Sequence, residues 1–313
     1  MQIKSLFGNG GKLGRIKRIQ RGRLTRMKRP VLFVCTNICV GLLMVVGFVG
    51  NLAAEKDTIQ IGYAKWSCAT ATSNVVKAVL QEKMDHGCKL VPMEAEALWL
   101  ATASKDIDGF VCAWLPSLHQ HLYAKAGYNV LDLGPNLKGT RVGLVVPDYV
   151  SIDSMSQLKD HAAQFGNRII GIEDSAGIMR LTHKAITSYK MQDMELISGS
   201  GQSMTKALGS KIKNREWVVV TGWTPHWKFA RWDLKYLQDP KNVYGGSESI
   251  HTVVRKGLQK DAPKVFRFLD NFQWSPEDIQ QVMDMIQGGG DPYSSAVTWV
   301  HQHPHQIQAW LPD

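Results

Sequence analysis

Short apolar runs alternate with longer amphipathic runs between residues 58 and 256, and this alternation limits the possible folds more than any other pattern in the sequence. The short runs have the length and composition of buried strands, and the long runs have helical periodicity. Such alternation is typical of an α/β fold, in which helices cover a sheet. Strands are predicted at 59–63, 89–92, 109–114, 130–133, 141–146, 169–173, 195–197, 217–223 and 250–255. Helices are predicted between them at 73–84, 94–104, 117–126, 156–165, 177–189 and 203–212.

The last part of the chain differs, because after Lys256 it contains only helical stretches, at 262–272, 276–287, 293–302 and 304–310. Two α/β segments and a helical tail predict two lobes, with the tail returning to the first lobe. The predicted limits are 1–54 for a leader, 55–147 and 248–313 for the first lobe, and 148–247 for the second lobe. Crossings between the lobes are expected near 147–156 and 240–249. Ligands of open α/β sheets bind beyond the carboxyl ends of the strands, which directs attention to those ends.

The first 54 residues have the order of an export signal, a basic segment followed by an apolar one. Ten of the 37 Lys and Arg residues lie within residues 1–30, which contain no acid, and the remaining 27 equal the 27 acids. The net charge of +10 therefore belongs to the leader and gives no reason to expect nucleic-acid binding. Residues 31–54 carry no charged side chain and are about long enough to span a bilayer.

Two outcomes for this leader are open. One is a signal peptide cleaved after Ala53 or Ala54, with Met27 as an alternative start, and the other is an uncleaved membrane anchor formed by residues 31–54. In both cases the positive-inside rule keeps the basic residues in the cytoplasm. The rest of the chain is therefore expected to be periplasmic or otherwise extracytoplasmic.

Five cysteines are present, of which Cys68, Cys88 and Cys112 lie outside the leader. An odd number in an exported protein leaves at least one thiol unpaired unless another chain supplies a partner. Buried free thiols are expected, since Cys112 lies within the apolar run 110–114. No two of the three have the spacing of zinc ligands, so neither a metal nor a cofactor is predicted.

Three of the ten tryptophans lie where predicted strands end, namely Trp66, Trp114 and Trp223. Indole is bulky and apolar and has a negative face, so several rings at one mouth can surround a cation that has no hydrogen-bond donor. A quaternary ammonium group is the ligand that suits such a box. The alternative is that these rings pack in the core or between the lobes.

A zwitterion would also need a site for its anion. The predicted strand 169–173 runs through a tight turn into a helix near Gly177. Amides at a helix start point outward with a favourable dipole, and glycine allows a carboxylate to approach the backbone. The alternative is an ordinary helix N-cap by Asp174 or Ser175.

Several segments resemble the glycine betaine/proline betaine substrate-binding proteins of ABC-type osmoprotectant importers. They are KWSCATATSNVVKAVL, CAWLPSLHQHLY, DLGPNLKGTRVGLVVPDYV, GIEDSAGIM and TGWTPHWKFARWDLKYLQDPK. The resemblance extends from about residue 59 to residue 310. It implies a two-lobed fold of the periplasmic-binding-protein type, also called type II or Venus-flytrap, with two crossing segments. The partners that it implies are glycine betaine or a related small zwitterion, an ABC transporter permease and its ATPase.

The same resemblance implies the residues of the binding site. The trimethylammonium group would lie in a cage of Trp66, Trp114 and Trp223, and the carboxylate would be held by the backbone of Gly177 and Ile178 and by His119. His119 follows Trp114 by five residues, so a following helix could return its side chain to the same mouth.

The sequence also bears on two other classes of function. An enzyme is disfavoured, because the sequence has no G-x-S-x-G elbow, H-E-x-x-H pair or phosphate-cradling loop. A binding protein for choline, carnitine or another quaternary ammonium or sulfonium compound remains the alternative. Choline lacks the carboxylate, so the turn at Gly177 would have no ligand group to bind.

Overall fold

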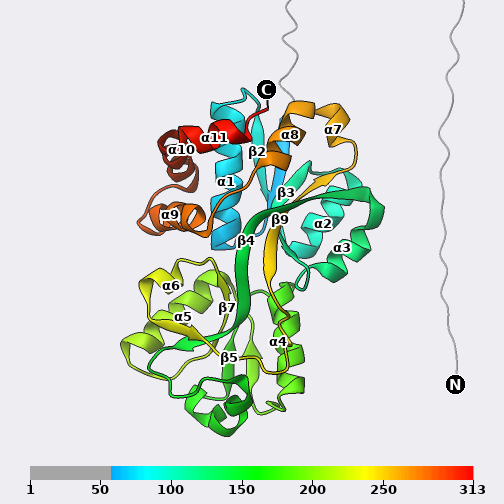
Figure 1. Cartoon of the computed structure of the whole chain (residues 1–313). Coiled ribbons are helices and arrows are strands. Elements are labelled where there is room, and N and C mark those ends of the chain that lie inside the picture. The colour runs from blue at the N-terminus through cyan, green and yellow to red at the C-terminus, as the bar shows by residue number, and fades with distance from the viewer. Residues whose placement is uncertain (1–57, 313) are drawn as a thin grey trace, which may run out of the picture. The chain divides into compact units, whose positions relative to one another are not determined.

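The computed structural model describes residues 58–312, in which helices and strands alternate as in an α/β protein (Figure 1). The strands are β1 (Ile59–Tyr63), β2 (Cys88–Pro92), β3 (Gly109–Leu115), β4 (Val130–Pro147), β5 (Arg168–Ile170), β6 (Glu195–Ile197), β7 (Val220–Thr224), β8 (Leu234–Tyr236) and β9 (Glu248–Arg255). The helices are α1 (Ser67–Glu82), α2 (Ala95–Ser104), α3 (Gln120–Ala126), α4 (Gly177–Ser188), α5 (Gly201–Lys213), α6 (Lys228–Arg231), α7 (Leu258–Asp261), α8 (Pro263–Asn271), α9 (Pro276–Gln287), α10 (Pro292–Gln302) and α11 (Pro304–Trp310). Two 3-10 helices are η1 (Gly127–Asn129) and η2 (Met155–Phe165).

Strand pairing divides the described residues into two lobes joined by β4. The strand order is β2-β1-β3-β9-β4-β7-β5-β6, with β8 paired to β4. Up to Thr140, β4 pairs with β9, and from Arg141 it pairs with β7. The first lobe consists of β1, β2, β3, β9 and residues 130–140 of β4, with the helices between them and the helical tail. The second lobe consists of residues 141–147 of β4 and strands β5 to β8, with the segments and helices between them. Figure 1 shows β4 running from one group of helices and strands to the other.

The passage within β4 differs from the prediction of two strands and a crossing after residue 146. The intervening segment stays paired with β9 through three register shifts, between Asp132 and Thr140. Gly134 and Gly139 have φ of +93° and +77°, which side chains rarely tolerate, so these glycines allow the bulged path. The predicted lobe limits at 147 and 247 remain a proposal, and the sheet pairing places the first passage earlier in the chain.

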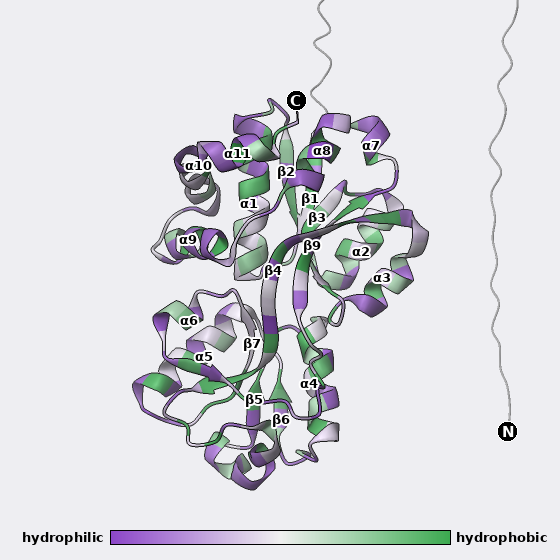
Figure 2. Cartoon of the chain, viewed as in Figure 1, coloured by the Kyte–Doolittle hydropathy of each residue, from purple (hydrophilic) through white to green (hydrophobic). Residues whose placement is uncertain are grey.

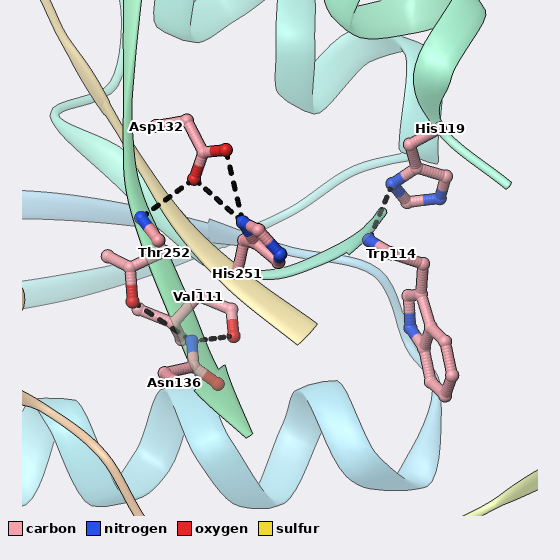
Figure 3. Close-up of polar contacts among 8 residues, drawn as sticks. Val111, Trp114, His119, Asp132, Asn136, His251 and Thr252 are labelled. Atoms are coloured by element: carbon pink, nitrogen blue, oxygen red, sulfur yellow. Dashed lines mark hydrogen bonds and ion pairs between the residues drawn. The ribbon is translucent and has the colours of Figure 1, made fainter. Parts of the chain in front are cut away.

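Polar side chains form hydrogen bonds among β3, β9 and β4 close to the point where β4 passes between the lobes (Figure 3). The Asn136 amide donates to the carbonyl of Val111 at 3.0 Å and to the Thr252 hydroxyl at 2.9 Å. His251 Nδ1 lies 2.9 Å from an Asp132 carboxylate oxygen. Burial alone would raise the pKa of Asp132, but the hydrogen bonds from His251 and the Gly134 amide lower it.

The helical tail packs on helix α1 of the first lobe. Helices α9 and α10 contact α1, and the Lys77 ammonium lies 4.6 Å from the centre of the Tyr293 ring. Trp299 and Trp310 stack at 6.0 Å within the tail. In Figure 2 the hydrophobic segments gather on the strands and on α1, whereas purple is prominent on the outer helices α7 and α9.

Most predicted elements have the expected type, and the deviations are local. Strands β5 and β7 are shorter than predicted, and β8 was not predicted because a three-residue strand leaves too short a pattern. Helix α1 begins at Ser67, six residues before the predicted start at Ser73. None of the helices within 58–312 is long and apolar enough to cross a membrane. The predicted leader lies outside the described residues.

Candidate functional site

One small apolar cavity collects all six of the predicted site residues. Its volume is about 20 Å3. The lining residues come from both lobes, and none of them carries a charge at neutral pH: Trp66, Trp114, Leu118, His119, Val142, Ile172, Ala176, Gly177, Ile178 and Trp223. We call this space the site cavity. Its walls are indole faces, aliphatic groups and one imidazole, which match an apolar ligand surface, and the lobes must separate to admit a ligand larger than about one water molecule.

Trp66 reaches the site cavity from the start of a helix and not from the end of a strand. It is the N-cap of α1, in extended conformation with φ −82° and ψ 149°, and its carbonyl accepts from the Thr70 amide at 2.8 Å. Its indole N–H donates to the carboxylate of Glu173 in the second lobe. This hydrogen bond orients the ring and joins the lobes at the rim of the cavity.

Trp114 and Trp223 occupy matching places in the two lobes. Trp114 lies in β3 opposite Ile250, and Trp223 lies in β7 opposite Val142. Each side chain is buried. Both strands are followed by a proline with a cis peptide bond, at Leu115–Pro116 and Thr224–Pro225.

Trp223 is supported from behind by residues of the same G-W-T-P-H-W segment and of α6. The His226 ring meets it edge-on at 4.9 Å, and the Lys228 ammonium lies 4.5 Å from the centre of its ring. Lys228 is fully buried and its Nζ has no hydrogen-bond partner among the described residues. Burial lowers the pKa of Lys228 to about 7.

His119 is held as a neutral hydrogen-bond donor. It is fully buried at the N-cap of α3. Its Nδ1 accepts from the Trp114 backbone N–H at 3.2 Å, as Figure 3 shows, and from the Trp99 indole N–H at 3.4 Å. Burial lowers its pKa to about 3, so the single ring hydrogen resides on Nε2. Nε2 has no partner in residues 58–312, and the His119 side chain lines the site cavity.

The start of α4 offers backbone amides to the same cavity. The N-cap is Ala176, with no side-chain cap, so the alternative of capping by Asp174 or Ser175 is wrong. The Ser175 hydroxyl instead donates to Glu94 of the first lobe at 2.6 Å. The first amides of a helix have no carbonyl one turn earlier, so those of Gly177 and Ile178 are available to an anion.

The close contact between the lobes at position 177 leaves no room for a side chain, so this residue is a glycine. A Cβ built on it would lie 2.7 Å from the Leu118 carbonyl oxygen and 3.0 Å from the Leu118 Cβ. The glycine therefore lets the start of α4 reach the segment that carries His119. Arg180, one turn further along α4, donates to the carbonyls of Ser117 and Leu118 at 3.2 and 3.4 Å.

Several residues of the site were not found from the sequence. Glu173 and Trp99 orient Trp66 and His119, and Lys228 lies against Trp223. Burial raises the pKa of Glu173. Only Glu173 had a usable signal, its place between a strand and the turn before Gly177, whereas contacts of Trp99 and Lys228 depend on how distant segments pack. Within the described part of the chain, no group of three His, Cys, Asp or Glu could hold a metal ion.

The fold and the site define an α/β binding protein of two lobes that contact each other around one small cavity. Residues 57–302 match the family described as "Substrate binding domain of ABC-type glycine betaine transport system". The chain therefore belongs to this family, which confirms the predicted resemblance and fold class. Its members are transport binding proteins and not enzymes, and the family is extracytoplasmic.

Two solved structures are similar over most of both chains. Lactococcal OpuAC, in its closed-liganded conformation complexed with glycine betaine, is 39% identical, with a TM-score of 0.78, over 82% of this chain and 99% of that one. The glycine betaine/L-proline-binding protein ProX of Borrelia burgdorferi is 38% identical, with a TM-score of 0.79, over 82% and 97%.

A curated relative matches over a shorter stretch. The glycine betaine/carnitine transport binding protein GbuC of Listeria monocytogenes is 45% identical over 154 residues, or 49% of this chain. The chain spans about half the length of that relative, 51%.

Proposed function

We propose that this protein captures glycine betaine, or a closely related betaine, outside the cytoplasm and delivers it to the permease and ATPase of an ABC importer. One observation carries the proposal. Three indoles from three separate elements and both lobes line a single cavity whose other walls carry no charge. A quaternary ammonium group accepts no hydrogen bonds and donates none, so indole faces are the groups best able to hold it.

The other end of the cavity suits the carboxylate. The Nε2–H of His119 has no partner among the described residues, and the first amides of α4, at Gly177 and Ile178, have no carbonyl one turn earlier to bond. All three residues line the cavity. Because His119 is neutral, it contributes a hydrogen bond without adding a positive charge beside the ammonium group. A zwitterion therefore finds a complement for each of its charges.

Closure is proposed to follow from ligand binding. The first lobe supplies Trp66, Trp114 and His119, and the second lobe supplies Trp223 and the start of α4. A ligand stabilises the closed state only as far as it binds that state better, and here both charges of a betaine contact both lobes. The closed form would then dock on the permease.

Support also comes from the relatives, since OpuAC is described with glycine betaine and GbuC with glycine betaine and carnitine. The test is a titration followed by tryptophan fluorescence and by calorimetry, with glycine betaine, proline betaine, carnitine and choline. Betaine should perturb the fluorescence and bind more tightly than choline. Choline binding without betaine binding would overturn the proposal in favour of a choline carrier.

The leader stays a separate proposal. Either cleavage after residue 53 or 54 releases the binding protein, or residues 31–54 anchor it. Sequencing the N-terminus of the exported protein distinguishes the two.

A further inference from the structure

Two thiols lie together beside the site cavity. The Sγ atoms of Cys68 and Cys112 are 3.9 Å apart, and both side chains are buried. Cys68 is in the first turn of α1, two residues after Trp66, and Cys112 is in β3, two residues before Trp114. The two thiols therefore lie where α1 contacts β3, and these two elements carry Trp66 and Trp114 of the first lobe.

At this distance the two sulfurs are in contact but are not joined by a disulfide bond. A disulfide requires the two sulfurs to approach to about 2.05 Å, and rotation of a cysteine side chain about χ1 moves its sulfur without moving the backbone. Both residues belong to the first lobe, so the distance between their sulfurs does not depend on how the lobes are placed, although access of an oxidant does.

Two residues of the second lobe, Trp223 and Lys228, lie close to the Cys68 sulfur. The hydrogen bond from Cys112 lowers the pKa of Cys68, burial opposes it, and the Trp223 indole beside the sulfur lowers it further. Lys228, also of the second lobe, is close enough for Cys68 to affect its pKa. Separation of the lobes would remove both residues from Cys68 and open it to the cleft.

The two sulfurs differ in acidity, and the difference favours Cys68 as the first to react. The pKa of Cys112 is raised by its hydrogen bond to Cys68 and by burial, whereas that of Cys68 is lowered. A thiolate is the attacking species, so Cys68 is suited to react first.

We propose that Cys68 and Cys112 form a redox-active dithiol, which is oxidised to a disulfide when the lobes are apart and is shielded when they close over ligand. The oxidant is a disulfide R–S–S–R of the extracytoplasmic space. The Cys68 thiolate attacks one of its sulfurs and releases R–S⁻, and Cys112 then attacks the mixed disulfide and releases the second R–S⁻. The two cysteine thiols lose two electrons and two protons, and R–S–S–R becomes two R–SH. The bond would tie α1 to β3 beneath the site.

Cys88 is an internal control in the same chain. It lies in β2, is buried, and its pKa is raised by burial to about 12. Its titration is influenced by Lys77 and Asp108 and by no residue of the second lobe. Its reactivity should therefore be independent of ligand.

The experiment treats the ligand-free protein with oxidised glutathione, alkylates the remaining thiols and maps peptides without reduction. A cross-linked peptide containing Cys68 and Cys112 is expected, with Cys88 alkylated. The bond should persist in Cys88→Ser and be lost in Cys68→Ser and Cys112→Ser. Full alkylation of both Cys68 and Cys112 in the wild type would overturn the proposal, and this result does not depend on whether the serine variants fold.

The second part of the experiment tests whether bound ligand protects the two thiols, and it rests on the proposed function. It compares the rate of cross-linking with and without glycine betaine. Saturating betaine should slow cross-linking of Cys68 to Cys112 about tenfold and change the alkylation rate of Cys88 by less than about twofold. If betaine perturbs tryptophan fluorescence but leaves cross-linking unchanged, shielding is wrong. If betaine does not bind at all while the cross-link forms, the proposed ligand is wrong and the dithiol stands.

Discussion

The two lobes contribute to the site cavity unequally. The first lobe combines five strands with the helical tail and presents two indoles and a neutral imidazole. The second lobe is built on short strands and presents one indole and the amides at the start of α4. Neither lobe alone would surround a cation or complete an anion site, so the proposed function makes ligand affinity and lobe closure depend on the same contacts.

The lobes also differ in what lies behind their indoles. Trp66 of the first lobe donates its N–H to Glu173, an acid of the second lobe. Trp223 of the second lobe has the unpartnered ammonium of Lys228 against its ring. The rings of the first lobe are therefore expected to carry most of the cation affinity, because the ring of Trp223 already faces the Lys228 amine, which is partly protonated near pH 7.

Removal of both indoles of the first lobe should have the largest effect. The double variant Trp66→Ala, Trp114→Ala is expected to weaken betaine binding about a hundredfold, since each ring face contributes roughly 0.5–2 kcal/mol. Calorimetry measures the loss. Trp310→Ala, which removes a buried indole of the same lobe that packs on Phe272, is the control and should leave affinity unchanged. A double variant that retains affinity would rule out the cage.

Removal of the single indole of the second lobe should cost less. Trp223→Ala is expected to weaken betaine binding at least about tenfold. The matched control is Trp217→Ala in the same lobe, whose ring packs on Phe165 at 5.2 Å and does not line the cavity. Equal affinities of Trp223→Ala and Trp217→Ala would show that the second lobe does not contact the ammonium group.

The anion site can be separated from the cage by comparing ligands. His119→Ala is expected to weaken binding of glycine betaine about fivefold and of choline less than about twofold, because only betaine has a carboxylate to accept the Nε2–H. Titration of both ligands measures this, with His161→Ala as control, because His161 is partly buried but does not line the cavity. Equal losses for betaine and choline would remove His119 from the anion site.

Lys228 should affect stability more than affinity. Burial lowers its pKa from 10.5 to about 7, so between these values the unfolded chain holds a proton that the folded chain has released. The free energy of unfolding therefore rises with pH across this window. Lys228→Met is expected to add about 2 kcal/mol near pH 7, with a gain that shrinks toward pH 10.5, and to change betaine affinity only about twofold.

Denaturant unfolding of Lys228→Met and wild type at several pH values measures this difference. Lys235→Met is a suitable control, because Lys235 is partly exposed and paired with Asp153 at 2.7 Å. A gain that is the same at pH 7 and pH 10.5 would mean that Lys228 is charged in the folded protein.

Some features of the site were predictable because they are local. The segments around Trp114, Trp223 and Gly177 each contain the end of a strand or the start of a helix. Short-range sequence patterns are enough to predict such termini. The early start of α1 was missed, since Trp66 has no capping side chain and the apolar pattern of the helix becomes clear only later. The long β4 was missed because its glycine-containing middle looks like a loop until β9 pairs with it.

By itself, the sequence determined the alternation of strands and helices, the family and the residues that could form a site. Only the tertiary structure decided that Trp66 bonds to Glu173, that His119 keeps its hydrogen on Nε2, and that Cys68 lies beside Cys112. The reason is physical. Periodicity and turn chemistry act over a few residues, whereas the contacts of Trp66 with Glu173, of Trp99 with His119 and of Cys68 with Cys112 join residues 107, 20 and 44 positions apart. Each of these contacts depends on how distant elements pack together.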